Sequence, residues 1–89
     1  RATLDFRPDG RLVGRGSCNR YTAAYELTGE GLTISPGAST RMACAEALMD
    51  QESRFFGAMA EVARFDLDAT GALLLLALDG TVAIRAMPE

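Results

Sequence analysis

Two cysteines, Cys18 and Cys44, are the first side chains in this sequence that could carry chemistry. Three interpretations are open, in order of preference. A disulfide would tie a predicted strand to the start of a predicted helix and, by closing a loop of roughly 25 residues, would stabilise the fold by about 3–4 kcal/mol. Two buried free thiols would instead pack as small apolar side chains. A catalytic or redox pair lacks both the two-residue spacing of a redox motif and a neighbouring base.

The sequence contains no histidine, which removes the usual general base at neutral pH and the usual zinc ligand. A Ser-His-Asp triad is therefore impossible within this chain. Asp66 and Asp68 lie on one face of a predicted strand but beside a turn, where carboxylates are normally solvated. The glycines from Gly10 to Gly16 are unevenly spaced and no helix follows them, so they predict no phosphate-binding loop. We expect a domain that is not an enzyme and that takes no cofactor or metal.

One stretch has the period of an amphipathic helix, which we expect to follow Cys44 and to end near Ala60. Its apolar stripe, read at 3.6 residues per turn, consists of Leu48, Met49, Phe55, Phe56 and Met59. Glu52 interrupts this stripe. Its carboxylate either reaches the rim of the apolar face or is buried and paired with an arginine such as Arg41 or with backbone donors, because a buried charge needs partners. A catalytic acid is the third alternative, and no neighbouring residue supports it.

Short apolar segments on both sides of the helix predict antiparallel strands. They cover residues 3–6, 12–18, 20–27, 32–35, 62–67, 72–78 and 82–86. Gly14 and Gly16 lie on one face of the second strand and leave room there for another side chain or a bulge. Pro36 and the glycine after it are expected to end the fourth strand. Asp79 and Gly80 predict a two-residue hairpin turn between the last two strands.

The four leucines at 73–76 leave this strand without a polar face. This favours a central strand under the helix, with both faces covered, over a patch for a partner or an apolar ligand. The expected fold is α+β, a curved or partly closed antiparallel sheet of about six to seven strands with one helix packed across it.

Length and charge limit the classes of function. The 89 residues are expected to form a single domain, with a net charge of -3 and a pI near 4.8 that disfavour nucleic-acid binding. The longest apolar run covers residues 72–78, so no transmembrane segment is predicted in this chain. Because the sequence opens at Arg1 without a methionine, we interpret it as a fragment or a processed product.

The order of several short motifs resembles the META domain, or HslJ-like, family of bacterial envelope proteins. The resemblance covers nearly the whole chain and rests on residues 16–21, Tyr25, residues 32–34, residues 39–44 and Glu52. It implies structural roles for Cys18, Asn19, Tyr25, Thr40, Met42, Cys44 and Glu52. Asn19 is expected to hold a turn through its side chain or to adopt a positive φ. Members usually begin with a further strand that carries a tryptophan, and this chain has none. That strand is expected upstream of Arg1 or replaced by another chain.

The resemblance implies a bacterial periplasmic or outer-envelope protein, lipid-anchored through a segment that precedes this chain. The expected function is a non-enzymatic envelope module, structural or protein-binding and related to stress, whose partner is another envelope protein or domain. The alternative is a carrier of a lipid or other small apolar ligand in a cleft between helix and sheet. The side chains expected to line such a cleft or a partner surface are Leu48, Phe55, Met59, Leu74 and Leu76. The oligomeric state is not predicted.

Overall fold

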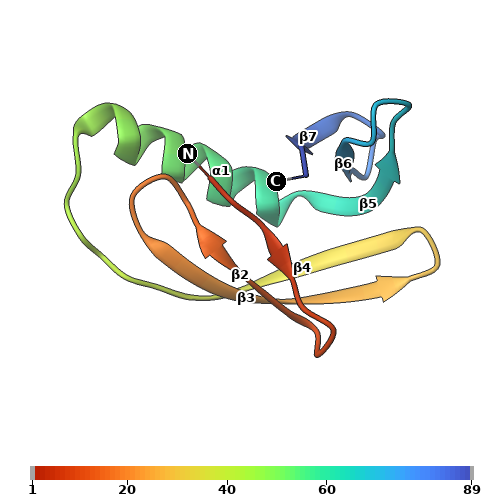
Figure 1. The fold of residues 1–89 in the computed structure, drawn as a ribbon, viewed down its shortest axis with the longest axis horizontal. Helices are drawn as coiled ribbons and strands as arrows, with labels where there is room; N and C mark the ends of the chain where they lie inside the picture. The colour runs from red at the N-terminus through yellow and green to blue at the C-terminus, as the bar shows by residue number, and fades with distance from the viewer. Residues whose placement is uncertain (1, 89) are drawn as a thin grey trace.

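The computed structural model describes residues 2–88, which form one seven-stranded antiparallel sheet and, within this range, one helix. The elements are β1 (Asp5–Phe6), β2 (Arg11–Arg15), β3 (Arg20–Thr28), β4 (Gly31–Ser39), α1 (Glu46–Ala60), β5 (Val62–Leu67), β6 (Leu73–Ala77) and β7 (Val82–Ala86). The strands neighbour one another in chain order from β1 to β7, and the sheet stays open (Figure 1). The predicted α+β fold is confirmed. Within residues 2–88, α1 is too short to cross a membrane.

Three of the hairpin turns share one geometry. In the loops at residues 8–10, 69–71 and 78–80, the third residue is a glycine with φ between 85° and 89°, and its N–H donates to the carbonyl three residues earlier. This is a three-residue loop with a bulged glycine. The predicted two-residue turn at Asp79 and Gly80 is therefore at the right place but one residue longer, because Leu78 belongs to the loop.

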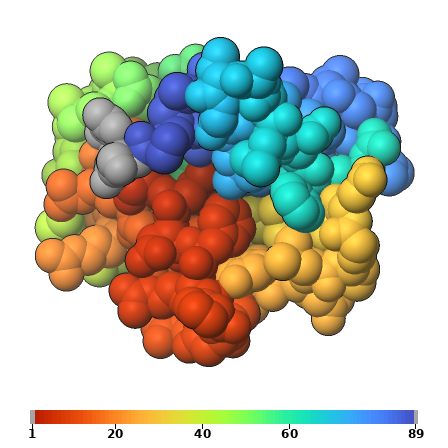
Figure 2. Space-filling view, turned by 45° about the vertical axis from the view of Figure 1, so that its right-hand side comes forward, coloured from red at the N-terminus to blue at the C-terminus, as the bar shows by residue number. Residues whose placement is uncertain are grey.

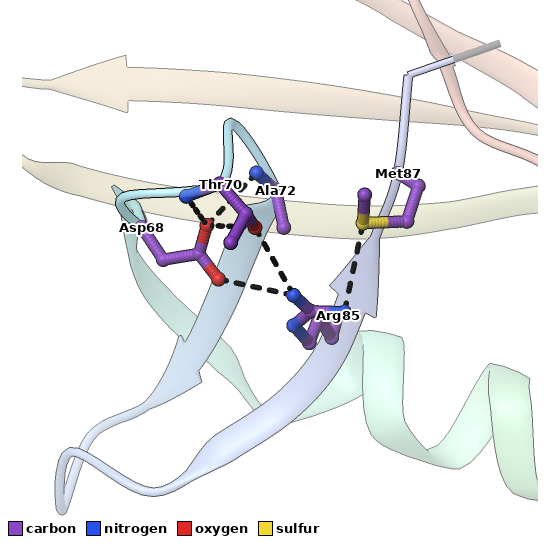
Figure 3. A network of polar contacts seen from close by, with 5 residues as sticks. All are labelled: Asp68, Thr70, Ala72, Arg85 and Met87. Atoms are coloured by element: carbon purple, nitrogen blue, oxygen red, sulfur yellow. Dashed lines mark hydrogen bonds and ion pairs between the residues drawn. The ribbon is translucent and has the colours of Figure 1, made fainter.

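The β5–β6 turn is held by one carboxylate. Asp68 Oδ1 accepts hydrogen bonds from Thr70 N at 2.8 Å, Thr70 Oγ1 at 2.6 Å and Ala72 N at 3.0 Å. Its Oδ2 accepts an ion-paired hydrogen bond of 3.2 Å from Arg85 on β7 (Figure 3). The Thr70 hydroxyl contributes most to holding the pKa of Asp68 low, at about 2. Asp68 therefore has a structural role, because its hydrogen bonds hold the β5–β6 turn and connect it to β7.

The sheet is divided between β4 and β5. These strands share one residue pair, Gly31 with Arg64, and a hydrogen bond of 3.2 Å from Phe65 N to Glu30 O. Strands β1–β4 and β5–β7 thus meet at one corner and diverge, and α1 contacts β4 and β7 (Figure 1). The space-filling view shows the β1–β2 hairpin in red beside the β3–β4 turn in orange and yellow, with β5–β7 above both (Figure 2).

The core lies between the helix and the concave face of the sheet. Its buried side chains are Leu12, Tyr21, Ala23, Leu32, Ile34, Met59, Val62 and Leu75. Gly16 lets the helix approach, because a Cβ built there would lie 2.9 Å from the Phe56 ring and 3.0 Å from Glu52 Oε1. The room predicted at this glycine is filled by two helix side chains. Met49, expected in the stripe, is instead 46% exposed.

Two strand predictions are corrected. Strand β4 continues through Pro36 and Gly37 to Ser39, because a bulge between Thr22 and Ala23 in the pairing with β3 accommodates them. Proline removes a hydrogen-bond donor but breaks no ladder when that donor would face away from the neighbouring strand. The run at 73–76 is covered on one face: Leu75 is fully buried, whereas Leu74 and Leu76 lie half-buried on the other face.

Candidate functional site

The two cysteines form a disulfide that joins the β2–β3 turn to the segment before α1. The Cα atoms of Cys18 and Cys44 lie 6.1 Å apart, and Cys18 is buried. The preferred sequence interpretation is confirmed, and the free-thiol and reactive-pair interpretations are wrong, because within residues 2–88 no cysteine is free. The bond fixes the long connection after β4, which passes around one end of the molecule (Figure 1).

Glu52 is buried and receives its hydrogen bonds from this same turn. Its Oε1 accepts from the backbone N–H groups of Cys18 at 3.1 Å and Asn19 at 2.6 Å, and its Oε2 accepts from Asn19 Nδ2 at 2.9 Å. Burial raises the pKa of Glu52, but these donors together outweigh it and lower the pKa below its ordinary value. The carboxylate is therefore ionised at neutral pH.

The partners of Glu52 decide between the sequence interpretations. The backbone donors predicted for a buried Glu52 are present, and a side chain that reaches the rim is wrong. Arg41, the suggested arginine, is not among its hydrogen-bond or ion-pair partners within residues 2–88. Sequence reasoning could not identify these donors because they lie 33 and 34 residues away in the chain.

Asn19 connects Glu52 to the segment before the helix. Its Oδ1 accepts hydrogen bonds from Thr40 Oγ1 at 2.9 Å and Met42 N at 2.7 Å, while its Nδ2 donates to Glu52 and, at 3.4 Å, to Met42 O. The Asn19 side chain was expected to hold a turn; instead it bonds to Thr40, Met42 and Glu52, at least 21 residues away in the chain. The positive φ occurs at Ser17 instead, with a value of 89°. Met42 contributes its backbone, and its side chain is 54% exposed.

Tyr25 has a comparable role at the opposite end of β3. Its hydroxyl donates to Arg7 O, and its ring meets Phe6 edge-on with centroids 5.1 Å apart. It thus closes the β1–β2 hairpin over β3.

Within residues 2–88, every buried side-chain nitrogen or oxygen has a hydrogen-bond partner. We call Cys18, Asn19, Cys44 and Glu52 the junction. Its side chains bond to one another, to the Thr40 hydroxyl and to the Met42 backbone.

A groove of about 450 Å³ lies on the other half of the helix. Its walls are residues 34 and 36–39 of β4, residues 21–23 of β3 and Phe56, Met59 and Ala60 of α1. Among residues 2–88, Arg41 is the one charged residue that lines it. Of the five apolar residues expected to line a cleft, Met59 lies here. Sequence reasoning missed the β4 wall. Pro36 was the available signal, because proline within a strand is typical of a sheet edge.

The other four predicted apolar residues lie elsewhere. Phe55 packs against the rings of Tyr21 and Phe56, with centroid distances of 5.7 Å and 5.9 Å. Leu48 is half-buried on the helix. Leu74 and Leu76 lie on the convex face of β6. Leu74 is paired with Asp66 on β5 and Arg85 on β7, and Leu76 is paired with Arg64 on β5 and Val82 on β7. The structure therefore separates two apolar surfaces that the sequence analysis had treated as one.

Comparison with known proteins identifies the family of this domain. The chain matches the family model of the META domain over residues 1–88. It is similar to a solved structure described as an NMR structure of the protein from Burkholderia xenovorans, with a TM-score of 0.65 and 26% sequence identity. The match covers 79% of this chain and 50% of that one, so the chain corresponds to about half the length of that protein. No curated protein matches the chain.

Proposed function

The chain belongs to the META domain family, and from this premise we propose that it is a non-enzymatic, protein-binding module of the bacterial cell envelope. The observation that carries the proposal is the contrast within the site. The buried Asn19 and Glu52 side chains and the two cysteines are engaged in the junction, and the hydroxyl of buried Tyr21 donates to Thr3 O. The open groove, in contrast, offers shape, apolar surface and one cation. Such a surface is suited to recognition.

The disulfide and the family membership indicate an extracytoplasmic protein, because disulfides persist in oxidising compartments. We assign the domain more narrowly to the bacterial periplasm or the outer envelope. In that compartment the Cys18–Cys44 bond stays formed and the connection before α1 stays fixed. The wall of the groove that ends in Arg41 is part of this connection and depends on the same bond.

Site-specific photocrosslinking in the bacterial periplasm tests the binding function. A crosslinking amino acid is placed at Ala38 in the groove, at Leu74 on the convex face of β6, or at Arg54 on the exposed side of α1. We expect a discrete protein adduct from Ala38 or Leu74 and none from Arg54. The absence of protein adducts from both test positions, with the domain folded and oxidised, would contradict the proposal.

A carrier of a small apolar ligand is the second candidate, and the specific observation in its favour is the groove volume of about 450 Å³. This volume is in the range of small-molecule sites. Native mass spectrometry of the domain purified without reductant separates the two functions. Excess mass that disappears on denaturation would favour the carrier, whereas a native mass equal to the chain mass would favour protein binding.

A further inference from the structure

The edge of β4 beside the groove has backbone groups that pair with no strand of the described residues 2–88. β4 pairs with β3 along its length. Within residues 2–88, the pairing of β4 with β5 is limited to Gly31 with Arg64, so residues 32–39 have no strand on this side. Ile34 lies opposite Tyr25, whose N–H donates in the other direction, to Gly10 O at 2.9 Å. In an antiparallel ladder, two such residues point their backbone groups away from each other. The N–H and C=O of Ile34 therefore face the free edge.

The same alternation applies further along the edge. Pro36 lies opposite Ala23, two residues before Tyr25, so its C=O faces outward and the donor that proline lacks would have faced outward too. After the bulge, Ser39 lies opposite Tyr21 and again faces outward, in agreement with the hydrogen bond of 3.0 Å from Thr40 N to Arg20 O. By this alternation, acceptors at 34, 36 and 39 and donors at 34 and 39 point to the edge. Pro36 and Ser39 are exposed, whereas Ile34 is 8% exposed and its groups lie at the buried end of this edge.

The groove lies directly against this edge. Its β4 wall runs from Ile34 to Ser39, and its opposite wall is the C-terminal half of α1, where Met59 is buried and Phe56 is half-buried. A strand added to β4 would place alternate side chains on the concave side of the sheet, over these apolar walls. Backbone recognition and side-chain recognition would thus occur in the same place, as in other domains that bind peptides between a strand and a helix.

Arg41 supplies the charge at the end of this edge. Arg41 is exposed. Within residues 2–88 it is the one charged residue that lines the groove, and it makes no ion pair with another residue of that range. An arginine recognises a carboxylate by paired hydrogen bonds. The net charge of the domain is -3, so a highly acidic partner is repelled, and one carboxylate aligned with Arg41 is the complement that fits.

We propose that the groove binds an extended peptide segment of a partner protein, added as a strand to the β4 edge, with an apolar side chain in the groove and an Asp or Glu side chain on Arg41. This inference rests on the proposed protein-binding function and names the class of partner. Pro36 interrupts the donor series, so backbone bonds alone do not hold a generic strand. The side chains of the partner therefore set the selectivity.

A displayed library of random peptides tests this proposal. The edge from Ile34 to Ser39 corresponds to about 20 Å of strand, so a peptide of about ten residues covers it. Selection on the oxidised domain is expected to enrich alternating apolar residues with one acidic residue near one end. An enriched peptide, labelled with fluorescein, is then measured by fluorescence anisotropy against the variants.

The variants separate the contacts. Arg41→Glu is expected to weaken binding about tenfold or more, and Ala60→Trp, which fills the groove from an exposed position, is expected to abolish it. Ala38→Trp blocks the opposite wall and serves if Ala60→Trp does not fold. Arg54→Glu is the matched control, since this exposed arginine does not line the groove, and its affinity is expected to be unchanged.

The peptide itself supplies two further measurements. Exchanging its acidic residue for the corresponding amide is expected to weaken binding to the wild type but not to Arg41→Glu. Binding is also expected to slow amide hydrogen exchange at Ile34 and Ser39, which side-chain contacts alone would not do.

Three results would overturn the peptide site: no enrichment, equal affinity for Ala60→Trp and the wild type, or unchanged exchange at Ile34. If protein adducts still form at Leu74 in the periplasm, the protein-binding function stands and its partner uses the convex face of β6. If the groove instead retains a small apolar molecule in the native mass spectrum, the carrier function replaces both.

Discussion

The helix packs in two different ways along its length. Glu52 is locked to the β2–β3 turn by three hydrogen bonds, and the disulfide fixes the adjoining segment. One turn further on, Phe56, Met59 and Ala60 face a groove beside a strand edge. One helix is thus anchored at one part, where each buried polar side chain within residues 2–88 is paired, and open for recognition at the next, where backbone groups of a strand remain available.

The largest effect is expected from removing the carboxylate that anchors the helix. Glu52→Ala leaves the N–H groups of Cys18 and Asn19 without acceptors in a buried place, and leaves the Asn19 amide nitrogen only its long bond of 3.4 Å to Met42 O. Each unsatisfied group costs about 1–3 kcal/mol, so we expect a loss of about 3–5 kcal/mol in the free energy of unfolding, measured by urea denaturation. Glu46→Gln, in the exposed first turn of the helix, is the control and should change stability by less than about 1 kcal/mol. A small loss for Glu52→Ala would mean that the junction does not anchor α1.

A somewhat smaller effect is expected from the disulfide. The double variant Cys18→Ser, Cys44→Ser should lose about 3–4 kcal/mol, since 26 residues separate the bonded positions. The same loss should follow reduction of the wild type before urea denaturation. If the oxidised and reduced domains unfold at the same urea concentration, the fixed segment before α1 owes its order to Asn19 and Glu52 alone.

Two glycines give a sharper comparison of the packed and exposed sides of α1. Gly16→Ala places a methyl group 2.9 Å from the Phe56 ring and is expected to cost about 1–3 kcal/mol through overpacking. Gly57→Ala meets no atom within 4 Å and should stabilise the exposed helix by up to about 1 kcal/mol. Thermal unfolding of both variants provides the measurement. Effects of the same sign would show that Gly16 is not a point of close approach.

The mildest change is expected from acid, and its sign follows from the lowered carboxylate pKa values. The pKa of Glu52 is lowered below 4.5 in the fold, and that of Asp68 falls from 3.8 to about 2. A lowered pKa contributes stability that is present above the ordinary value and is lost as pH falls through the folded value. Urea midpoints should therefore be constant from about pH 7 to 5 and decline below about pH 4.

The variant Asp68→Asn identifies the source of the acid response. It should remove the part of the decline that occurs between about pH 4 and 2, where Asp68 takes up its proton. The part that remains should be due to Glu52, whose donors come from the β2–β3 turn, and to Asp79, whose pKa is lowered by hydrogen bonds from Thr81. An identical decline in the wild type and in Asp68→Asn would contradict the role of the β5–β6 turn.

Much of the fold could be predicted because its signals are local. The stripe ending at Met59 specified the helix, and the loop glycines specified turns whose place did not depend on distant contacts. The motif resemblance identified the junction residues before their bonds were known. Pro36 misled the prediction, since its effect on a strand depends on whether the missing donor faces a neighbour or an edge. Leu74 and Leu76 also misled it, because an apolar run does not say how many faces are covered.

The sequence by itself therefore determined the helix, the turns, the single pair of cysteines and the anomaly of Glu52 within an apolar stripe. Tertiary structure decided what accepts and donates at Glu52, since the partners are 33 and 34 residues away. It also decided where the sheet divides. The groove exists because β5 leaves β4 after one residue pair while α1 covers the concave face. That arrangement depends on the path of the whole chain in space, and no local pattern of residues encodes it.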